Sequence, residues 1–156
     1  MSGPALWPFA LDVYGRPGVE TALLELQDAH GQCVPLLIWT LWLAAEGRIA
    51  DDGALASAAE LARAWQDAAV APLRGLRRGL KSPSSKAPAR AWRTLREGVK
   101  ALELDAERML LEMLEAASPA PGGAASDARA LLGKAVAAWG RPAPADLLAR
   151  LTAAAA

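Results

Sequence analysis

The chain is poor in the residues that form covalent cross-links and metal sites. Its 156 residues include one cysteine, Cys33, and one histidine, His30. A single cysteine excludes a disulfide within the chain, which is typical of a reducing compartment. A structural zinc site needs about four ligands, so the sequence predicts no metal and no cofactor.

Long apolar runs and strand-forming aromatic residues are also scarce. The chain has one Phe and one Tyr, and few strand formers other than Val. Its most apolar stretch, Val34–Ala45, is twelve residues long, whereas a membrane span needs about 20. The segment from Met1 to Leu11 lacks the basic start and long apolar run of a signal peptide. We therefore expect no membrane span and a cytoplasmic location.

What the chain has in abundance is helix-forming residues, chiefly Ala, Leu, Arg and Glu. Apolar residues recur at helical spacing in most segments, and Leu36–Leu43 is apolar on every side, as in a central helix. The sequence predicts an all-α single-domain bundle of five to six helices around a central apolar helix at about 34–46. The expected helices are 6–14, 19–30, 35–46, 54–71, 72–81, 89–117 and 126–139, with a last turn or two near Leu147–Leu151.

Proline and glycine divide this pattern. Pro72 is expected to kink or restart the helix that precedes it. Residues 82–88 predict a flexible linker within a helical domain spanning 1–117. Residues 118–156 predict an Ala- and Pro-rich C-terminal helical extension with a thin apolar face, which we expect to pack weakly.

Positive charge is concentrated in one window. Residues 74–100 hold nine basic residues and one acid, Glu97, for a formal charge of +8, whereas residues 1–73 carry −6 and residues 101–156 carry −2. Helical spacing places many of these cations on common faces. The candidate anion- or partner-binding residues are Arg74, Arg77, Arg78, Lys81, Arg90, Arg93, Arg96 and Lys100.

These cations allow two interpretations. They can bind an acidic protein, a phosphorylated ligand or nucleic acid, or they can be solvated or paired with the protein's own acids. Trp92 is the one aromatic residue in the window, which argues against single-strand binding by base stacking. Glu103 and Glu107 are expected to face solvent.

The helix at 89–117 carries a heptad pattern. Apolar residues recur at spacings of three and four along it, at Trp92, Leu95, Val99, Leu102, Ala106, Met109 and Met113. Such a seam can pack inside the domain or form a homo-oligomer. The second functional hypothesis is therefore a structural, oligomerising helical protein.

Catalytic signals are weak. His30 and Cys33 flank a helix break at Gly31, and no oxyanion motif accompanies them. A small helical enzyme with a pocket near Gln27, His30 and Trp39 is the third hypothesis, and we assign no catalytic residue.

Several segments in order resemble a known family. They are Leu6-Trp7-Pro8-Phe9-Ala10-Leu11, Pro17-Gly18-Val19, Trp42-Leu43-Ala44, Pro72-Leu73-Arg74, Leu76-Arg77-Arg78 and Ala106-Glu107-Arg108. Over about residues 5–115 the chain resembles the bacterial, chiefly proteobacterial, family known as domain of unknown function 2390. The resemblance implies an all-helical intracellular protein and no assigned reaction or cofactor. This chain has Cys33-Val34-Pro35 where the family pattern suggests an acid and an amide.

The leading functional hypothesis is a non-enzymatic binding or adaptor protein that contacts an anionic partner through the basic residues of 74–100.

Overall fold

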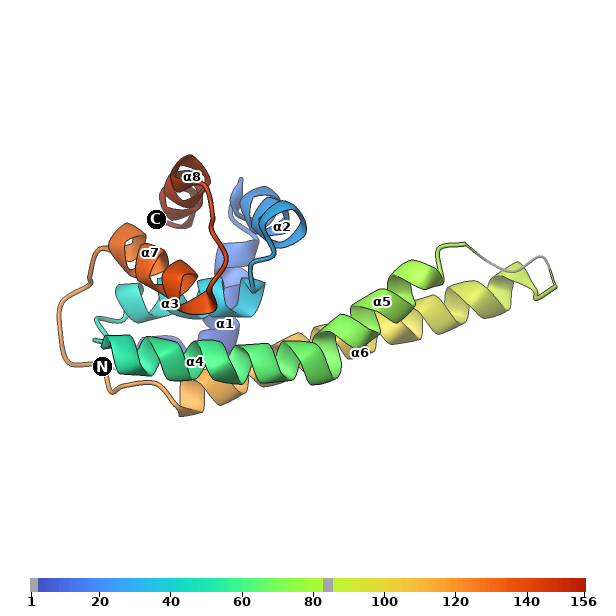
Figure 1. Ribbon diagram of the computed structural model, residues 1–156, viewed down its shortest axis with the longest axis horizontal. Coiled ribbons are helices and arrows are strands. Elements are labelled where there is room, and N and C mark those ends of the chain that lie inside the picture. Colours follow the sequence, from blue (N-terminus) through green and yellow to red (C-terminus); the bar gives the residue numbers. More distant parts are fainter. Residues whose placement is uncertain (1–2, 83–85) are drawn as a thin grey trace.

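The computed structural model describes residues 3–82 and 86–156, and this part of the chain is all helical (Figure 1). The helices are α1 (Leu6–Tyr14), α2 (Val19–His30), α3 (Val34–Ala45), α4 (Asp52–Trp65), the π-helix η1 (Gln66–Val70), α5 (Ala71–Gly79), α6 (Ala89–Ala116), α7 (Ala128–Trp139) and α8 (Ala145–Ala155). The all-α prediction is confirmed. Because α4, η1 and α5 follow one another without a break, the described residues form seven helical rods rather than the five or six predicted.

The central helix is α3, as predicted. All residues from Val34 to Ala44 are buried, and the helix packs against α1, α2, α4, α6 and α7. Pro35 lies in its first turn, where the missing proline N–H removes no helical hydrogen bond. The two buried tryptophans find polar partners, since Trp42 Nε1 donates to the Pro4 carbonyl at 2.9 Å and Trp39 Nε1 donates to Ser118 Oγ at 2.7 Å.

The C-terminal helices belong to the core, which overturns one expectation. Leu132, Leu147 and Leu151 are fully buried, with α7 packed on α3 and α4, and α8 packed on α2. The expectation that this segment packs weakly is therefore wrong, although the division of the chain at residue 118 stays an interpretation. Asp127 caps α7 by accepting hydrogen bonds from the Arg129 and Ala130 amides.

Pro72 is accommodated by a change of helical type. It lies in the first turn of α5, directly after η1. Proline lacks the N–H that would bond to the carbonyl four residues earlier, and its ring crowds that carbonyl. The π-helical turn immediately before it shifts the hydrogen-bond register by one residue, so the rod continues into α5. Trp65 holds this region to α6 by donating to the Ala106 carbonyl at 2.7 Å.

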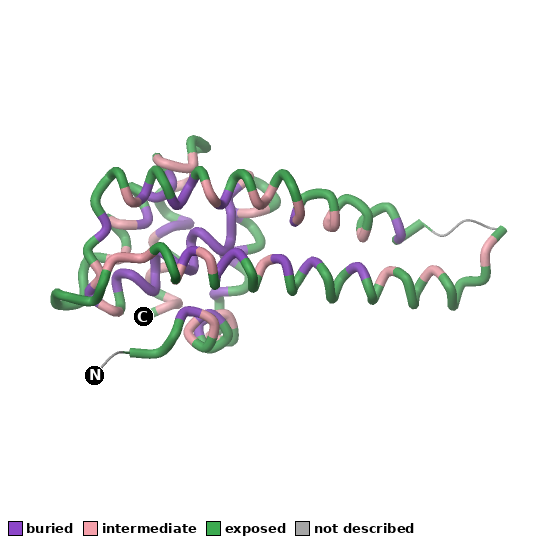
Figure 2. The backbone as a smooth tube through the Cα atoms, turned by 90° about the horizontal axis from the view of Figure 1, so that it is seen from below, coloured by how far each residue is buried: buried purple, intermediate pink, exposed green. Residues whose placement is uncertain are grey.

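A two-helix arm projects from the rest of the molecule. α5 and the first part of α6 run antiparallel and pack on each other beyond the other helices (Figures 1 and 2). We call residues 71–82 and 86–100 the arm. Leu80 and Val99 are the buried side chains among its described residues. The core of the predicted linker, residues 83–85, lies outside the described residues.

Candidate functional site

The eight predicted cations separate into two groups. Arg74 and Arg77, near the base of the arm, are half-buried and face acids of α6. Arg96 is also half-buried. The other cations are exposed, and they are Arg78, Lys81, Arg90, Arg93 and Lys100.

Arg74 and Arg77 form a charge cluster with Glu103 and Glu107. Arg74 Nε donates to Glu103 Oε1 at 3.0 Å, and its Nη2 donates to Glu107 Oε1 at 3.1 Å. Arg77 donates from Nε to Glu103 Oε2 and from Nη2 to Glu103 Oε1. Spacings of three and four residues place each pair on one helix face, and the packing of α5 on α6 brings the two faces together.

This cluster corrects the expectation that the two glutamates face solvent. Glu103 is buried at 7% exposure, and Glu107 is half-buried. The candidate surface predicted from the sequence therefore loses Arg74 and Arg77, which are paired inside the structure. Their partners come from the second half of the chain and not from the acidic first half.

The pKa values of Glu103 and Glu107 are shifted in opposite directions. Burial alone would raise the pKa of Glu103, but hydrogen bonds from Arg77 and Arg74 outweigh it, and the pKa is lowered. Burial raises the pKa of Glu107, and the single hydrogen bond from Arg74 does not offset it. The hydrogen bond to Glu103 raises the pKa of Arg77.

Among the described residues, four exposed cations of the arm remain open to a partner. Arg78 Nη2 lies 3.3 Å from Asp28 Oδ1, but both side chains are more than half exposed, so this ion pair is weak. Within residues 3–82 and 86–156, no ion pair involves the exposed cations Lys81, Arg90, Arg93 or Lys100.

Two buried polar atoms of the arm lack a partner. Trp92 Nε1 and Arg96 Nε, one helical turn apart on α6, have no hydrogen bond in the described part of the chain. Both residues are half-buried. They lie within the same stretch of helix as the exposed cations Arg90 and Arg93.

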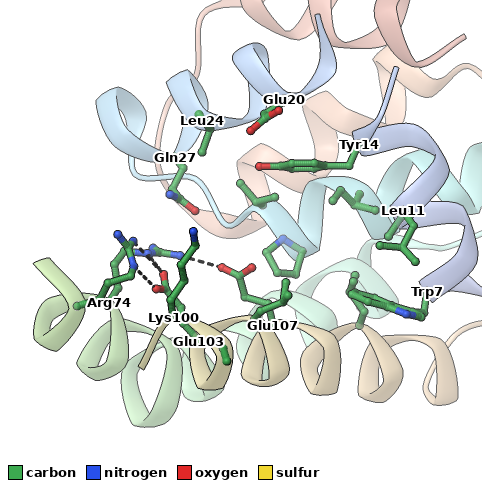
Figure 3. A pocket seen from close by; sticks show the side chains of 18 of the residues that line it. Trp7, Leu11, Tyr14, Glu20, Leu24, Gln27, Arg74, Lys100, Glu103 and Glu107 are labelled. Carbon is green, nitrogen blue, oxygen red and sulfur yellow. Dashed lines mark hydrogen bonds and ion pairs between the residues drawn. The ribbon is translucent and has the colours of Figure 1, made fainter. Parts of the chain in front are cut away.

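A pocket of about 780 Å³ lies between α1, α2, α3, α5 and α6 (Figure 3). Its apolar lining includes Trp7, Leu11, Leu24, Pro35, Ile38, Leu104 and Leu111, and its polar lining includes Tyr14, Glu20, Gln27, Arg74, Lys100, Glu103 and Glu107. Burial raises the pKa of Tyr14, and the negative charges of Glu20 and Glu107 raise it further. Sequence reasoning missed this pocket, because it is formed by five helices that meet only in the folded chain.

The pocket suggested near Gln27, His30 and Trp39 does not form as one site. Gln27 lines the large pocket, whereas Trp39 is 2% exposed and lines a separate cavity of about 220 Å³. Burial raises the pKa of Cys33 to about 12, so its thiol is neutral at pH 7 and unsuited to nucleophilic attack. No group of three His, Cys, Asp or Glu side chains in the described residues is placed to hold a metal.

The heptad seam of α6 is divided between core and solvent. Val99 and Ala106 are buried, and Trp92 and Met113 are half-buried. In contrast, the other three residues of the seam are exposed, with Leu95 at 54%, Leu102 at 56% and Met109 at 50%. Four of the seven residues of the seam therefore pack inside the protein, and the other three form an apolar stripe on its surface.

None of the helices in the described part of the chain combines the length and apolar character required to traverse a bilayer.

Comparison with known protein families yields a match. A model of the family described as "Protein of unknown function (DUF2390)" matches residues 5–114, more than two thirds of the chain. The curated proteins and the solved structures contain no significant match. The match agrees with the order of the motifs between residues 5 and 115, and the chain belongs to the DUF2390 family.

Proposed function

We propose that this protein is a non-enzymatic binding protein that contacts an anionic partner through its basic arm. The observation that carries the proposal is a projecting helical hairpin with exposed cations that have no ion pair among the described residues. The binding residues are Lys81, Arg90, Arg93, Arg96 and Lys100, with Arg78 contributing through its weak, exposed pair.

The charge that remains on the arm is substantial. Three of the eight predicted cations, Arg74, Arg77 and Arg78, have acidic partners, which leaves five. With the negative charge of Glu97 included, these residues carry a formal charge of +4. The segments on both sides of the arm in the sequence carry a net negative charge, and the arm projects beyond the other helices (Figure 1). Such an uneven distribution favours encounter with a negative partner.

The arm's composition favours an acidic protein segment over single-stranded nucleic acid. Trp92 is the only aromatic residue between 71 and 100, and it is half-buried. Base stacking needs exposed rings, whereas arginine guanidinium groups bind carboxylates in pairs without them. Duplex nucleic acid and a phosphorylated ligand are the competing anionic partners for the test to separate.

The experiment is charge reversal at the outer end of the arm. Reversing Arg77 would disrupt its pairs with Glu103, so the informative variant is the double substitution Arg90→Glu and Arg93→Glu at two exposed positions. Arg129→Glu with Lys134→Glu is the matched control, because these exposed cations lie on α7 and outside the arm. Fluorescence anisotropy would follow binding of a labelled acidic peptide, a phosphopeptide and a DNA duplex at low and high salt.

We expect the arm variant to lose binding and the α7 control to retain it. Wild-type binding should weaken as salt rises, because the screening length falls from about 10 Å at 0.1 M to about 3 Å at 1 M. Equal binding by wild type and the arm variant at low salt would reject the proposal. The order of affinity among the three probes identifies the partner class.

A homo-oligomer is the second candidate, and the stripe of Leu95, Leu102 and Met109 favours it. Exposed apolar side chains seven residues apart on one helix are typical of a helix–helix interface. Sedimentation equilibrium of wild type and Leu102→Lys tests it. A wild-type monomer at high concentration would eliminate this candidate.

A further inference from the structure

The pocket at the base of the arm has the graded lining of a small-molecule site. Trp7 and Leu11 lie at one end, and Arg74 and Lys100 lie at the other (Figure 3). Tyr14 and Glu107 stand between them, from α1 and α6. An apolar pocket with a few convergent polar groups is the usual form of a ligand site.

The charges around the pocket are not balanced. The lining holds three cations, Arg74, Arg77 and Lys100, and four acids, Glu20, Glu97, Glu103 and Glu107. The two arginines are already bound to Glu103 and Glu107. Because these two arginines and two glutamates cancel, the charges left in the lining are Lys100, Glu20 and Glu97, for a net charge of −1. Beyond the effect of burial, the carboxylates of Glu20 and Glu107 raise the pKa of the nearby Tyr14.

Glu107 has capacity for a further hydrogen bond. Its Oε1 accepts from Arg74 at 3.1 Å, and its Oε2 has no hydrogen-bond partner within the described residues. Burial raises the pKa of this carboxyl group despite the hydrogen bond from Arg74, so burial disfavours its ionised form. A bound cation would favour that form.

We propose that this pocket binds a small amphipathic organic cation, a primary amine carried on an apolar body. The ammonium group bonds to Glu107 beside Tyr14, and the apolar body packs against Trp7 and Leu11. A carboxylate head group in the same position would meet the negative charges of Glu20 and Glu107. Lys100 lies at the opposite end of the pocket from Trp7 and Leu11. Lys100 and Glu20 are both exposed, so solvent screens both charges, whereas Glu107 is half-buried.

Three probes of equal chain length test the head-group preference. They are n-octylamine, 1-octanol and octanoate, which contain eight carbon atoms each and differ in the charge of the head group. The amine is protonated at pH 7, since alkylammonium pKa values lie near that of lysine, about 10.4. Isothermal titration calorimetry should show the amine binding about tenfold or more tightly than the alcohol, as expected for one charge-assisted hydrogen bond, and octanoate binding most weakly.

A substitution at Glu107 identifies the binding group. Glu107→Gln keeps the shape and the acceptor oxygen for Arg74 but removes the charge, so the affinity for octylamine should fall to that for octanol. Glu112→Gln is the matched control, because Glu112 is exposed on the same helix outside the pocket lining. If Glu107→Gln fails to fold, Glu20→Gln at an exposed position of α2 should give a smaller loss of the same preference.

The outcomes separate this proposal from the function of the arm. Octanoate binding as tightly as octylamine, no binding of any probe at millimolar concentration, or an unchanged preference in the variant that folds would each overturn it. Arg90→Glu with Arg93→Glu should leave octylamine binding unchanged, because neither residue lines the pocket.

Discussion

Removing the charge of Glu103 should destabilise the fold more than removing any exposed carboxylate. Glu103 accepts three hydrogen bonds from two guanidinium groups, one from Arg74 and two from Arg77. Glu103→Gln would replace one carboxylate oxygen with an amide donor that faces these donors. Two cations would then lose a buried partner.

The size of the effect follows from the burial of the cluster. Loss of one partner from a fully buried pair costs about 3–5 kcal/mol. The side chains of Arg74 and Arg77 keep 14% and 21% of their exposure, and Arg74 retains Glu107, so we expect about 2–3 kcal/mol here. For a chain of this size, that loss lowers Tm by about 5–10 °C.

The pH dependence gives an independent check. The folded-state pKa of Glu103 lies below its ordinary value of 4.5, so its ionised form contributes stability at pH values above 4.5. That contribution is lost as pH falls through the folded-state pKa. The difference in free energy of unfolding between wild type and Glu103→Gln should therefore be full at pH 7 and should shrink below pH 4.5.

Urea unfolding followed by circular dichroism measures both effects. Glu112→Gln is the control, because its pair with Arg108 is about half exposed on both sides and should change stability by less than about 0.5 kcal/mol. Glu103→Gln within about 0.5 kcal/mol of wild type at pH 7 would refute the reasoning.

Three further predictions follow from burial. Leu132→Ala truncates a fully buried side chain of α7 and should lower the free energy of unfolding by about 2–5 kcal/mol, measured by urea unfolding. A decrease below about 1 kcal/mol would show that α7 is not part of the core. Cys33, buried and with a pKa of about 12, should react with a thiol reagent only after denaturant is added, and fast labelling of the native protein would contradict its placement. The folded-state pKa of Glu107 is raised, so ionisation of this group lowers the stability of the wild type as pH rises above 4.5. The free energy of unfolding of Glu107→Gln should therefore increase relative to that of wild type from about pH 4.5 upward in the same assay. The opposite trend would contradict the direction of the pKa shift.

Local signals predicted the helices well because each depends on residues close in sequence. Gly31 ends α2 with a positive φ of 62°, as its position after the apolar pattern indicated. Pro35 and the surrounding apolar run located the central helix to within a residue or two. The motifs between residues 5 and 115 were sufficient to identify the family.

The C-terminal segment shows where local signals fail. A thin apolar face on an Ala-rich helix looks weak by itself, but Leu132, Leu147 and Leu151 are each completely enclosed by other helices. Burial depends on what the other helices present, and the sequence of one segment does not contain that information.

The sequence alone determined the helical class, the central position of α3 and the concentration of positive charge between residues 74 and 100. The tertiary structure alone decided which of those charges are paired, because the packing of α5 on α6 pairs Arg74 and Arg77 with Glu103 and Glu107 and leaves Arg90 and Arg93 exposed. It also decided that a pocket exists, since five helices must meet to enclose it. The physical reason is the range of the forces: helix propensity acts over a few residues, whereas ion pairing and burial act between residues tens of positions apart.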